Sequence, residues 1–333
     1  MGHLVRCRAL AAALKKRGED CLMIGPAAQF AGPGDSHIFS EWLPDTQWRS
    51  SEDDASKVLA IAGRTGASWV VLDDYRIDEQ YQLMLKAAGL HLLHFDGGSS
   101  QPLWADIVVD ASPGASSERF KTRMRNAHGR LMLGPRHAVL RAGFPPGDIR
   151  QSGRPVEQVL VMFGGGDDRG AIQFVLSALL PATHAGIKFL VISGASNPRN
   201  GDLQKWVVDH GQGRVKLAID PDPIAPLFTE CELALIAGGT STYEAACSGL
   251  PMVIVTIAEN QIDQAESWAR SGAALYVGPL DGVTAEELQS EIGRLIADDA
   301  QRARMSDIGR DLADGRGAER LARAMIDYPE RRT

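Results

Sequence analysis

The chain has 333 residues, of which 44% are hydrophobic and 23% charged, a composition that excludes a disordered or fibrous protein. Its length favours two domains of roughly 150 residues each. The net charge of -7 argues against a nucleic-acid partner, because phosphate contacts need a surplus of Lys and Arg. The longest apolar run, near 251–257, is too short to span a bilayer, and no signal peptide opens the chain. We therefore expect a cytoplasmic protein without stable membrane association; its oligomeric state is left open.

The sequence contains no motif that indicates a metal or cofactor site. Its four cysteines form no CxxC pair and have no histidines at metal-ligand spacing, so we expect buried thiols. Asp220 and Asp222 spell a DxD motif, but each precedes a proline, and we interpret them as caps at the start of a helix. The absence of a GxGxxG motif and of a Walker A lysine argues against NAD and ATP. We expect neither a metal nor a cofactor.

Short β-branched or leucine-rich segments alternate with segments of helical period, which predicts parallel strands covered by helices. We predict strands at 21–24, 69–73, 91–96, 107–110, 131–133, 159–163, 188–192, 215–219, 233–236, 252–255 and 275–277. Turn-forming residues crowd the stretch 134–155, which marks a domain boundary. The prediction is an α/β protein with two Rossmann-like domains, at 1–145 and 155–333, the second carrying the closing helices.

The predicted first domain begins at a loop, although a Rossmann domain normally opens with a strand. Either its sheet lacks that strand or the chain start is too late; we favour the second hypothesis, which identification of Met1 or Gly2 as the native N-terminus by mass spectrometry would exclude. His3 lies in this loop, just before a helix. A cationic histidine is disfavoured at a helix N-terminus, so a neutral His3 is a candidate general base, although lone histidines are more often structural.

The clearest local signal is the segment Ala237–Glu244, which follows a buried strand and opens a helix. Gly238 and Gly239 allow close approach of the backbone to a ligand, and the helix start offers free amides that suit a diphosphate. The candidate hydroxyl donors are Thr240, Ser241 and Thr242. Glu244 lies one turn into the helix, where its carboxylate can accept hydrogen bonds from a ribose diol. An ordinary turn with a Ser or Thr cap explains the same segment equally well.

Three further groups of residues follow predicted strands. Gly164 and Gly165 come after 159–163, where a tight turn without a ligand is the alternative explanation. Asp73, Asp74 and Tyr75 end another strand; the tyrosine can bond a sugar hydroxyl or acetamido group, whereas helix capping explains the aspartates as well. Asn260 and Gln261 follow 252–255 and offer amides for sugar or phosphate oxygens.

Together these segments resemble the nucleotide-sugar hydrolases of pseudaminic acid biosynthesis, a branch of the GT-B superfamily related to the lipid II-forming GlcNAc transferase. The matching elements span nearly the whole chain in order: Gly2–Cys7, Leu72–Tyr75, Leu133–Arg136 with Leu140 and Arg141, Phe163–Gly165, Ala237–Glu244, Ala258–Gln261 and Asp314–Ala318. The sequence departs from the family pattern at Asp96-Gly97-Gly98-Ser99 and at Ala111-Ser112-Pro113. Both departures lie in the first domain and bear on the identity of the sugar.

The resemblance implies hydrolysis of UDP-2,4-diacetamido-2,4,6-trideoxy-β-L-altrose, with His3 as the catalytic base. It implies that Gly238–Glu244 holds the diphosphate and uridine, and it places Tyr75, Asn260 and Gln261 near the sugar or phosphate. We expect Gly2, Arg6, Asp74, Gly164 and Gly165 to bind the substrate as well. Imidazole and amide donors would then act on opposite sides of one glycosyl carbon, with inversion. The alternatives are a GT-B glycosyltransferase that moves the sugar to an acceptor, and a non-catalytic UDP-sugar-binding module.

Overall fold

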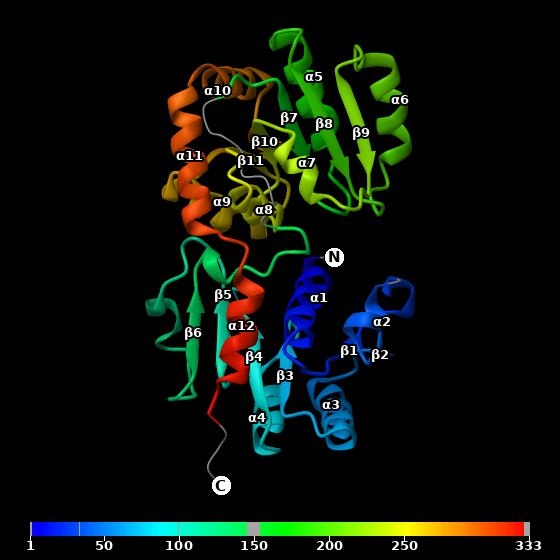
Figure 1. The fold of residues 1–333 in the computed structure, drawn as a ribbon, viewed down its shortest axis with the longest axis vertical. Coiled ribbons are helices and arrows are strands. Elements are labelled where there is room, and N and C mark those ends of the chain that lie inside the picture. The colour runs from blue at the N-terminus through cyan, green and yellow to red at the C-terminus, as the bar shows by residue number, and fades with distance from the viewer. Residues whose placement is uncertain (1, 33, 99, 145–153, 330–333) are drawn as a thin grey trace. The chain divides into compact units, whose positions relative to one another are not determined.

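The computed structural model describes all residues except 1, 33, 99, 145–153 and 330–333 (Figure 1). The chain divides into two compact units, which we describe separately. The first unit combines Gly2–Arg141 with the segment from Arg316 onward, and the second comprises Ala142–Gly315. The chain passes from the first unit to the second between Arg141 and Ala142. The prediction that all closing helices belong to the second domain is wrong for the last one, α12 (Gly317–Ile326), which packs in the first unit.

The first unit contains two parallel sheets (Figure 1). One consists of β1 (Leu22–Gly25) and β2 (Glu41–Pro44). The other has the order β3-β4-β5-β6, formed by β3 (Trp69–Leu72), β4 (His91–Phe95), β5 (Ile107–Asp110) and β6 (Arg130–Leu133). Within the described residues no strand joins the two sheets. Because all these strands run in parallel, their carboxyl ends share one edge, where Asp73 follows β3 and Asp96 follows β4.

Helices cover both faces of the four-stranded sheet. On one face α1 (Gly2–Lys15) and α12 bury Leu10, Leu14 and Leu321 against β4 and β5. On the other face α3 (Ser51–Thr65) and α4 (Glu79–Ala87) bury apolar side chains such as Val58 and Leu85. The short α2 (Asp35–Ile38) contacts α1. Asp78 caps α4 by accepting a hydrogen bond from the Tyr81 amide, so neither Asp73 nor Asp74 is a helix cap.

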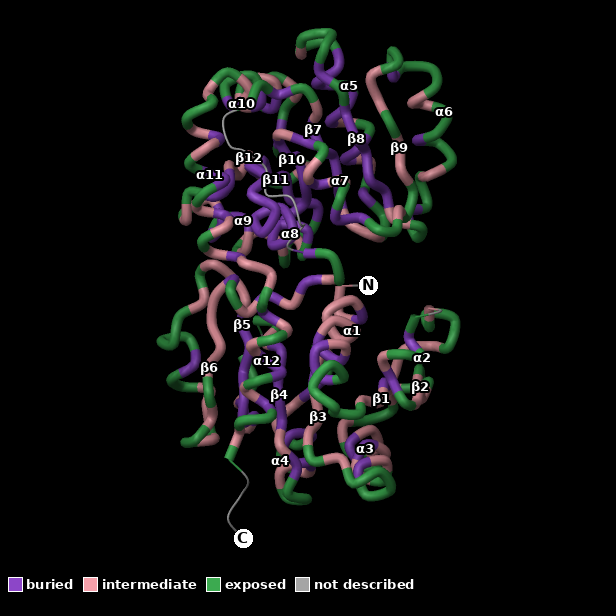
Figure 2. The backbone as a smooth tube through the Cα atoms, viewed as in Figure 1, coloured by how far each residue is buried: buried purple, intermediate pink, exposed green. Residues whose placement is uncertain are grey.

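The second unit is built on one six-stranded parallel sheet with the order β12-β11-β10-β7-β8-β9. Its strands are β7 (Gln158–Met162), β8 (Lys188–Ser193), β9 (Val215–Ile219), β10 (Leu233–Ile236), β11 (Met252–Thr256) and β12 (Ala274–Pro279). Its helices are α5 (Ala171–Ala182), α6 (Asn200–His210), α7 (Ala225–Thr229), α8 (Ser241–Cys247), α9 (Ile262–Ser271), α10 (Ala285–Ala297) and α11 (Asp299–Leu312). The central strands are almost entirely buried (Figure 2), as continuous apolar runs require in a parallel sheet.

All eleven predicted strands are present, with boundaries shifted by at most two residues, and β2 was not predicted. The interpretation of Asp220 and Asp222 as helix caps is wrong, because α7 begins only at Ala225 and Asp220 has a left-handed backbone with φ of 47°. Across the part of the chain that the structure describes, no helix has both the length and the apolarity to traverse a bilayer.

Candidate functional site

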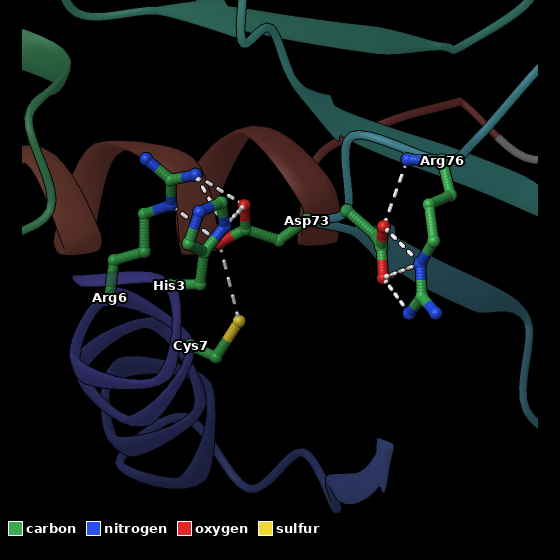
Figure 3. Close-up of polar contacts among 6 residues, drawn as sticks. His3, Arg6, Cys7, Asp73 and Arg76 are labelled. Carbon is green, nitrogen blue, oxygen red and sulfur yellow. Dashed lines mark hydrogen bonds and ion pairs between the residues drawn. The ribbon is translucent and has the colours of Figure 1, made fainter. Parts of the chain in front are cut away.

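His3 lies on the first turn of α1, and its imidazole meets the carboxylate that follows β3 (Figure 3). Nδ1 of His3 is 2.6 Å from Oδ1 of Asp73. The His3 side chain is 37% exposed, whereas that of Asp73 is 5% exposed. The helix and the strand end therefore present a histidine that solvent can reach, held by a buried carboxylate.

Arg6, one turn further along α1, makes a two-pronged ion pair with the same carboxylate (Figure 3). Its Nε donates to Oδ2 of Asp73 at 2.5 Å, and its Nη2 donates to Oδ1. Burial acts to raise the pKa of Asp73, but the hydrogen bonds and charges of Arg6 and His3 outweigh it and lower that pKa to about 2. Asp73 is therefore an anion at any pH near neutrality.

The partners of Nδ1 decide which nitrogen of His3 can act as a base. A carboxylate only accepts hydrogen bonds, so the contact with Asp73 requires a proton on Nδ1. Nη2 of Arg6 lies 3.1 Å from the same nitrogen, but a guanidinium nitrogen is only a donor and cannot accept a hydrogen bond from Nδ1–H. With Nδ1 donating to Asp73, Nε2 of the neutral ring carries the lone pair, as in other histidine bases oriented by a carboxylate.

Cys7 also faces Asp73, with its Sγ 3.7 Å from Oδ2 (Figure 3). Burial, followed by the Asp73 charge, raises the pKa of the Cys7 thiol to about 12. The thiol stays protonated near neutral pH and is therefore a poor nucleophile.

Asp74 and Tyr75, both predicted to contact substrate, lie beside this cluster. Asp74 accepts hydrogen bonds from the backbone amide and the side chain of Arg76, both at 2.9 Å. The Tyr75 ring is 67% exposed and stands edge-on to the His3 ring, with centroids 5.0 Å apart. Gly2 opens α1 without a side chain. Substrate contacts of Gly2, Arg6, Asp74 and Tyr75 remain predictions.

In the second unit the segment 238–242 turns from β10 into α8. The internal hydrogen bonds of the turn begin with the Thr242 amide, which donates to the Gly239 carbonyl at 3.1 Å. The amides that precede it have no intrahelical acceptor, as at any helix start. Gly238 is buried where a Cβ would lie 2.9 Å from the carbonyl oxygen of Gln261, so glycine is required for this close packing.

Gln264 of α9 holds this turn together, although no sequence signal pointed to it. Its Nε2 donates to the Gly239 carbonyl at 2.9 Å and to the Thr242 hydroxyl at 3.0 Å, and its Oε1 accepts from the Tyr243 hydroxyl at 3.2 Å. The Thr242 hydroxyl in turn donates to the Gly239 carbonyl at 2.7 Å. Thr242 is therefore committed to the turn, and a direct ligand contact from it stays an untested prediction.

The other predicted ligands of this segment differ in exposure. Thr240 is exposed, whereas Ser241 and Glu244 are 5% and 2% exposed. Contacts of the Glu244 carboxylate with a ribose stay a prediction. Asn260 lies exposed on a short 3-10 turn, whereas Oε1 of Gln261 accepts from the Ile257 amide at 3.0 Å and so stabilises the start of that turn.

Gly164 and Gly165 follow β7 in a turn whose first residue requires glycine. Gly164 has φ of 95°, in the left-handed region. Gly194 follows β8 and packs closely on Gly165: a Cβ on Gly194 would lie 2.6 Å from the carbonyl carbon of Gly165. The backbone of this loop is thus tightly fixed, and its predicted contact with UDP remains a prediction.

Solved structures with the same architecture define the fold. MurG of Acinetobacter baumannii superposes with a TM-score of 0.68 at 15% identity, covering 98% of this chain and 96% of that one. The UDP co-structure of S. aureus MnaA gives a TM-score of 0.65 at 12% identity, covering 98% and 94%. The chain therefore has the GT-B fold, two α/β domains with parallel sheets, as predicted.

Sequence comparisons point in the same direction. The family described as "UDP-glucoronosyl and UDP-glucosyl transferase" matches residues 234–324, which include the 238–244 turn. The spore coat polysaccharide biosynthesis protein SpsG of Bacillus subtilis strain 168 is 25% identical over 99% of this chain and 95% of its own length. The chain is thus similar to glycosyltransferases over part of its second unit and to SpsG over nearly its whole length.

Proposed function

We propose that the chain is a glycosyl-transfer enzyme with a UDP-sugar donor, in which His3 is the general base. The observation that carries this proposal is the 2.6 Å contact between Nδ1 of His3 and the buried Asp73 carboxylate, which leaves Nε2 to accept a proton. The match of residues 234–324 to UDP-dependent transferases supports binding of the nucleotide by the second unit.

In the proposed reaction, a hydroxyl nucleophile attacks the anomeric carbon while its proton moves to Nε2 of His3. The new bond joins the nucleophile oxygen to that carbon, and the bond between the carbon and the diphosphate oxygen breaks. UDP leaves with the electron pair, so the site must stabilise negative charge more than it must protonate the leaving group. The anomeric configuration inverts, because attack and departure occur on opposite faces.

Two nucleophiles are compatible with this base, and different findings support each. An acceptor hydroxyl is favoured by the transferase family that matches the second unit. Water is favoured by the motifs Gly2–Cys7 and Leu72–Tyr75, which resemble the hydrolases that act on UDP-2,4-diacetamido-2,4,6-trideoxy-β-L-altrose. We rank transfer to an acceptor first and hydrolysis of a UDP-diacetamido sugar second.

The test is UDP release from a panel of UDP-sugars, including UDP-GlcNAc and UDP-diacetamido-trideoxy hexoses, with and without sugar acceptors. Release only with an acceptor supports the transferase, and equal release without one supports the hydrolase. UDP binding by calorimetry without turnover of any donor, in either condition, would overturn the enzyme proposal in favour of a binding module.

A further inference from the structure

The Tyr75 ring occupies space that exists only because residue 97 is glycine. A Cβ on Gly97 would lie 2.8 Å from Cδ1 of Tyr75 and closer still to Cε1. Side chains do not approach a Cβ this closely, so any other residue at 97 would displace the ring. The ring thus lies directly against the backbone that follows β4.

The backbone conformation at Gly97 does not itself require glycine. Its φ lies outside the left-handed region, in contrast to Gly98, whose φ is 83°. Alanine can therefore adopt the backbone geometry at 97 without strain. The three heavy atoms nearest to such a methyl group all belong to the Tyr75 ring. Glycine at this position serves the ring and not the turn.

The backbone beneath the ring is anchored, so the ring is the part that would move. The Asp96 amide donates to the Val109 carbonyl at 2.8 Å, which ties this segment to β5. The Asp96 carboxylate accepts from Arg123 at 2.7 and 3.2 Å, and the two side chains are 1% and 11% exposed. This buried ion pair holds the segment after β4 in place.

The Tyr75 ring packs beside the imidazole of His3. It stands edge-on to the imidazole, at an interplanar angle of 83°, while most of its area faces solvent. An exposed aromatic face beside a base offers an apolar surface to the C–H groups of a sugar, with the phenol hydroxyl as a polar contact at its edge.

We infer that Gly97 is a positioning residue, which seats Tyr75 beside His3 and so sets the aromatic surface that contacts the donor's sugar. The inference rests on the proposed function, because it assigns the sugar to this face. Its consequence is that donor selectivity depends on a residue that itself makes no polar contact with the sugar. Contacts of this kind in a binding pocket change specificity by about 10- to 200-fold.

The experiment compares Gly97→Ala, Tyr75→Leu and the double variant, with Gly63→Ala as the matched control. Gly63 lies on α3, and a Cβ there meets no atom within 4 Å, so this control should behave as wild type. We expect Gly97→Ala to raise KM for the preferred donor about 10-fold with little change in kcat, the pattern of lost binding to the sugar. The double variant should be no worse than Tyr75→Leu, because both changes remove the same contact.

A second readout needs no substrate. With 13C-labelled histidine, the His3 ring signal, assigned by its loss in His3→Asn, should shift in Gly97→Ala as it does in Tyr75→Leu. Wild-type KM together with an unshifted His3 signal in Gly97→Ala, or additive losses in the double variant, would overturn the inference. If the wild type turns over no donor, the proposed function fails. The wild type and Gly97→Ala are then compared by their Kd for a UDP-sugar, and an unchanged Kd overturns the inference.

Discussion

Replacing Asp73 by Asn should disable His3 while keeping the shape of the site. Without the carboxylate, Nη2 of Arg6, which lies 3.1 Å from Nδ1 of His3, can donate to that nitrogen. The ring then carries its proton on Nε2 and cannot accept another there as a neutral base. A general base contributes about 10²- to 10⁴-fold, so we expect kcat to fall by that factor while the Kd for UDP stays unchanged.

The same substitution has a calculable effect on stability. A pKa lowered from 3.8 to about 2 in the folded state corresponds to about 2 kcal/mol in the free energy of unfolding. Because the folded pKa is depressed, this contribution is present above pH 4 and is lost as the pH falls towards 2. Urea unfolding should therefore show Asp73→Asn to be less stable than wild type by about 2 kcal/mol at pH 7, with a smaller difference near pH 2.

The matched control is Asp35→Asn. Asp35 accepts hydrogen bonds of 2.7 and 2.6 Å from Arg8, which lies on α1 as Arg6 does. The two ion pairs are similarly buried: the side chains of Asp35 and Arg8 are 8% and 26% exposed, and those of Asp73 and Arg6 are 5% and 26% exposed. No histidine takes part in it. Asp35→Asn should lose stability but keep kcat within about twofold. An Asp73→Asn enzyme with wild-type kcat, or an equal loss of kcat in the control, would refute the reasoning.

Three further predictions concern other parts of the chain. Gln264→Ala should cost the second unit about 1–3 kcal/mol and weaken UDP binding, measured by urea unfolding and calorimetry; unchanged affinity would separate α9 from the nucleotide site. Gly194→Ala should likewise weaken UDP binding, because its Cβ meets the Gly165 backbone; wild-type affinity would contradict this. Burial lowers the pKa of His94 to about 4, so the folded state keeps this histidine neutral where the unfolded state would protonate it. The free energy of unfolding should therefore fall by about 3 kcal/mol as the pH drops from about 6.5 towards 4. His94→Leu should be less sensitive to acid over that range, and an unchanged pH profile of unfolding would refute this.

The strands that were predictable are those with continuous apolar runs. The predicted bounds of β10 match the structure, because its four residues are all apolar and buried and leave no polar position to confuse the pattern. The bounds of β5 and β9 match as well, although β9 contains the exposed Lys216. The four residues of β2 include Glu41 and Pro44, which do not read as a strand. The period of α12 predicts an apolar face, but a period cannot say which sheet that face covers.

The candidate site was predictable where a local motif carried it. His3 stood at a helix start, and the glycine turns followed buried strands. The pairing of His3 with Asp73 was not predicted, because only the pleat of β3 decides which of the two adjacent carboxylates, Asp73 or Asp74, faces α1. Gln264 lies 25 positions from Gly239, with no local signal. The departure at Gly97 was visible in the sequence, but its reason, the seat for Tyr75, required the structure.

The central claim, that His3 is the base, is tested most directly by the turnover of His3→Asn. Asparagine cannot accept a proton near neutral pH, and the second unit, which is proposed to bind UDP, is left untouched. The account predicts that kcat falls by about 10²- to 10⁴-fold while calorimetry gives a wild-type Kd for UDP. Turnover at the wild-type rate in this variant would contradict it.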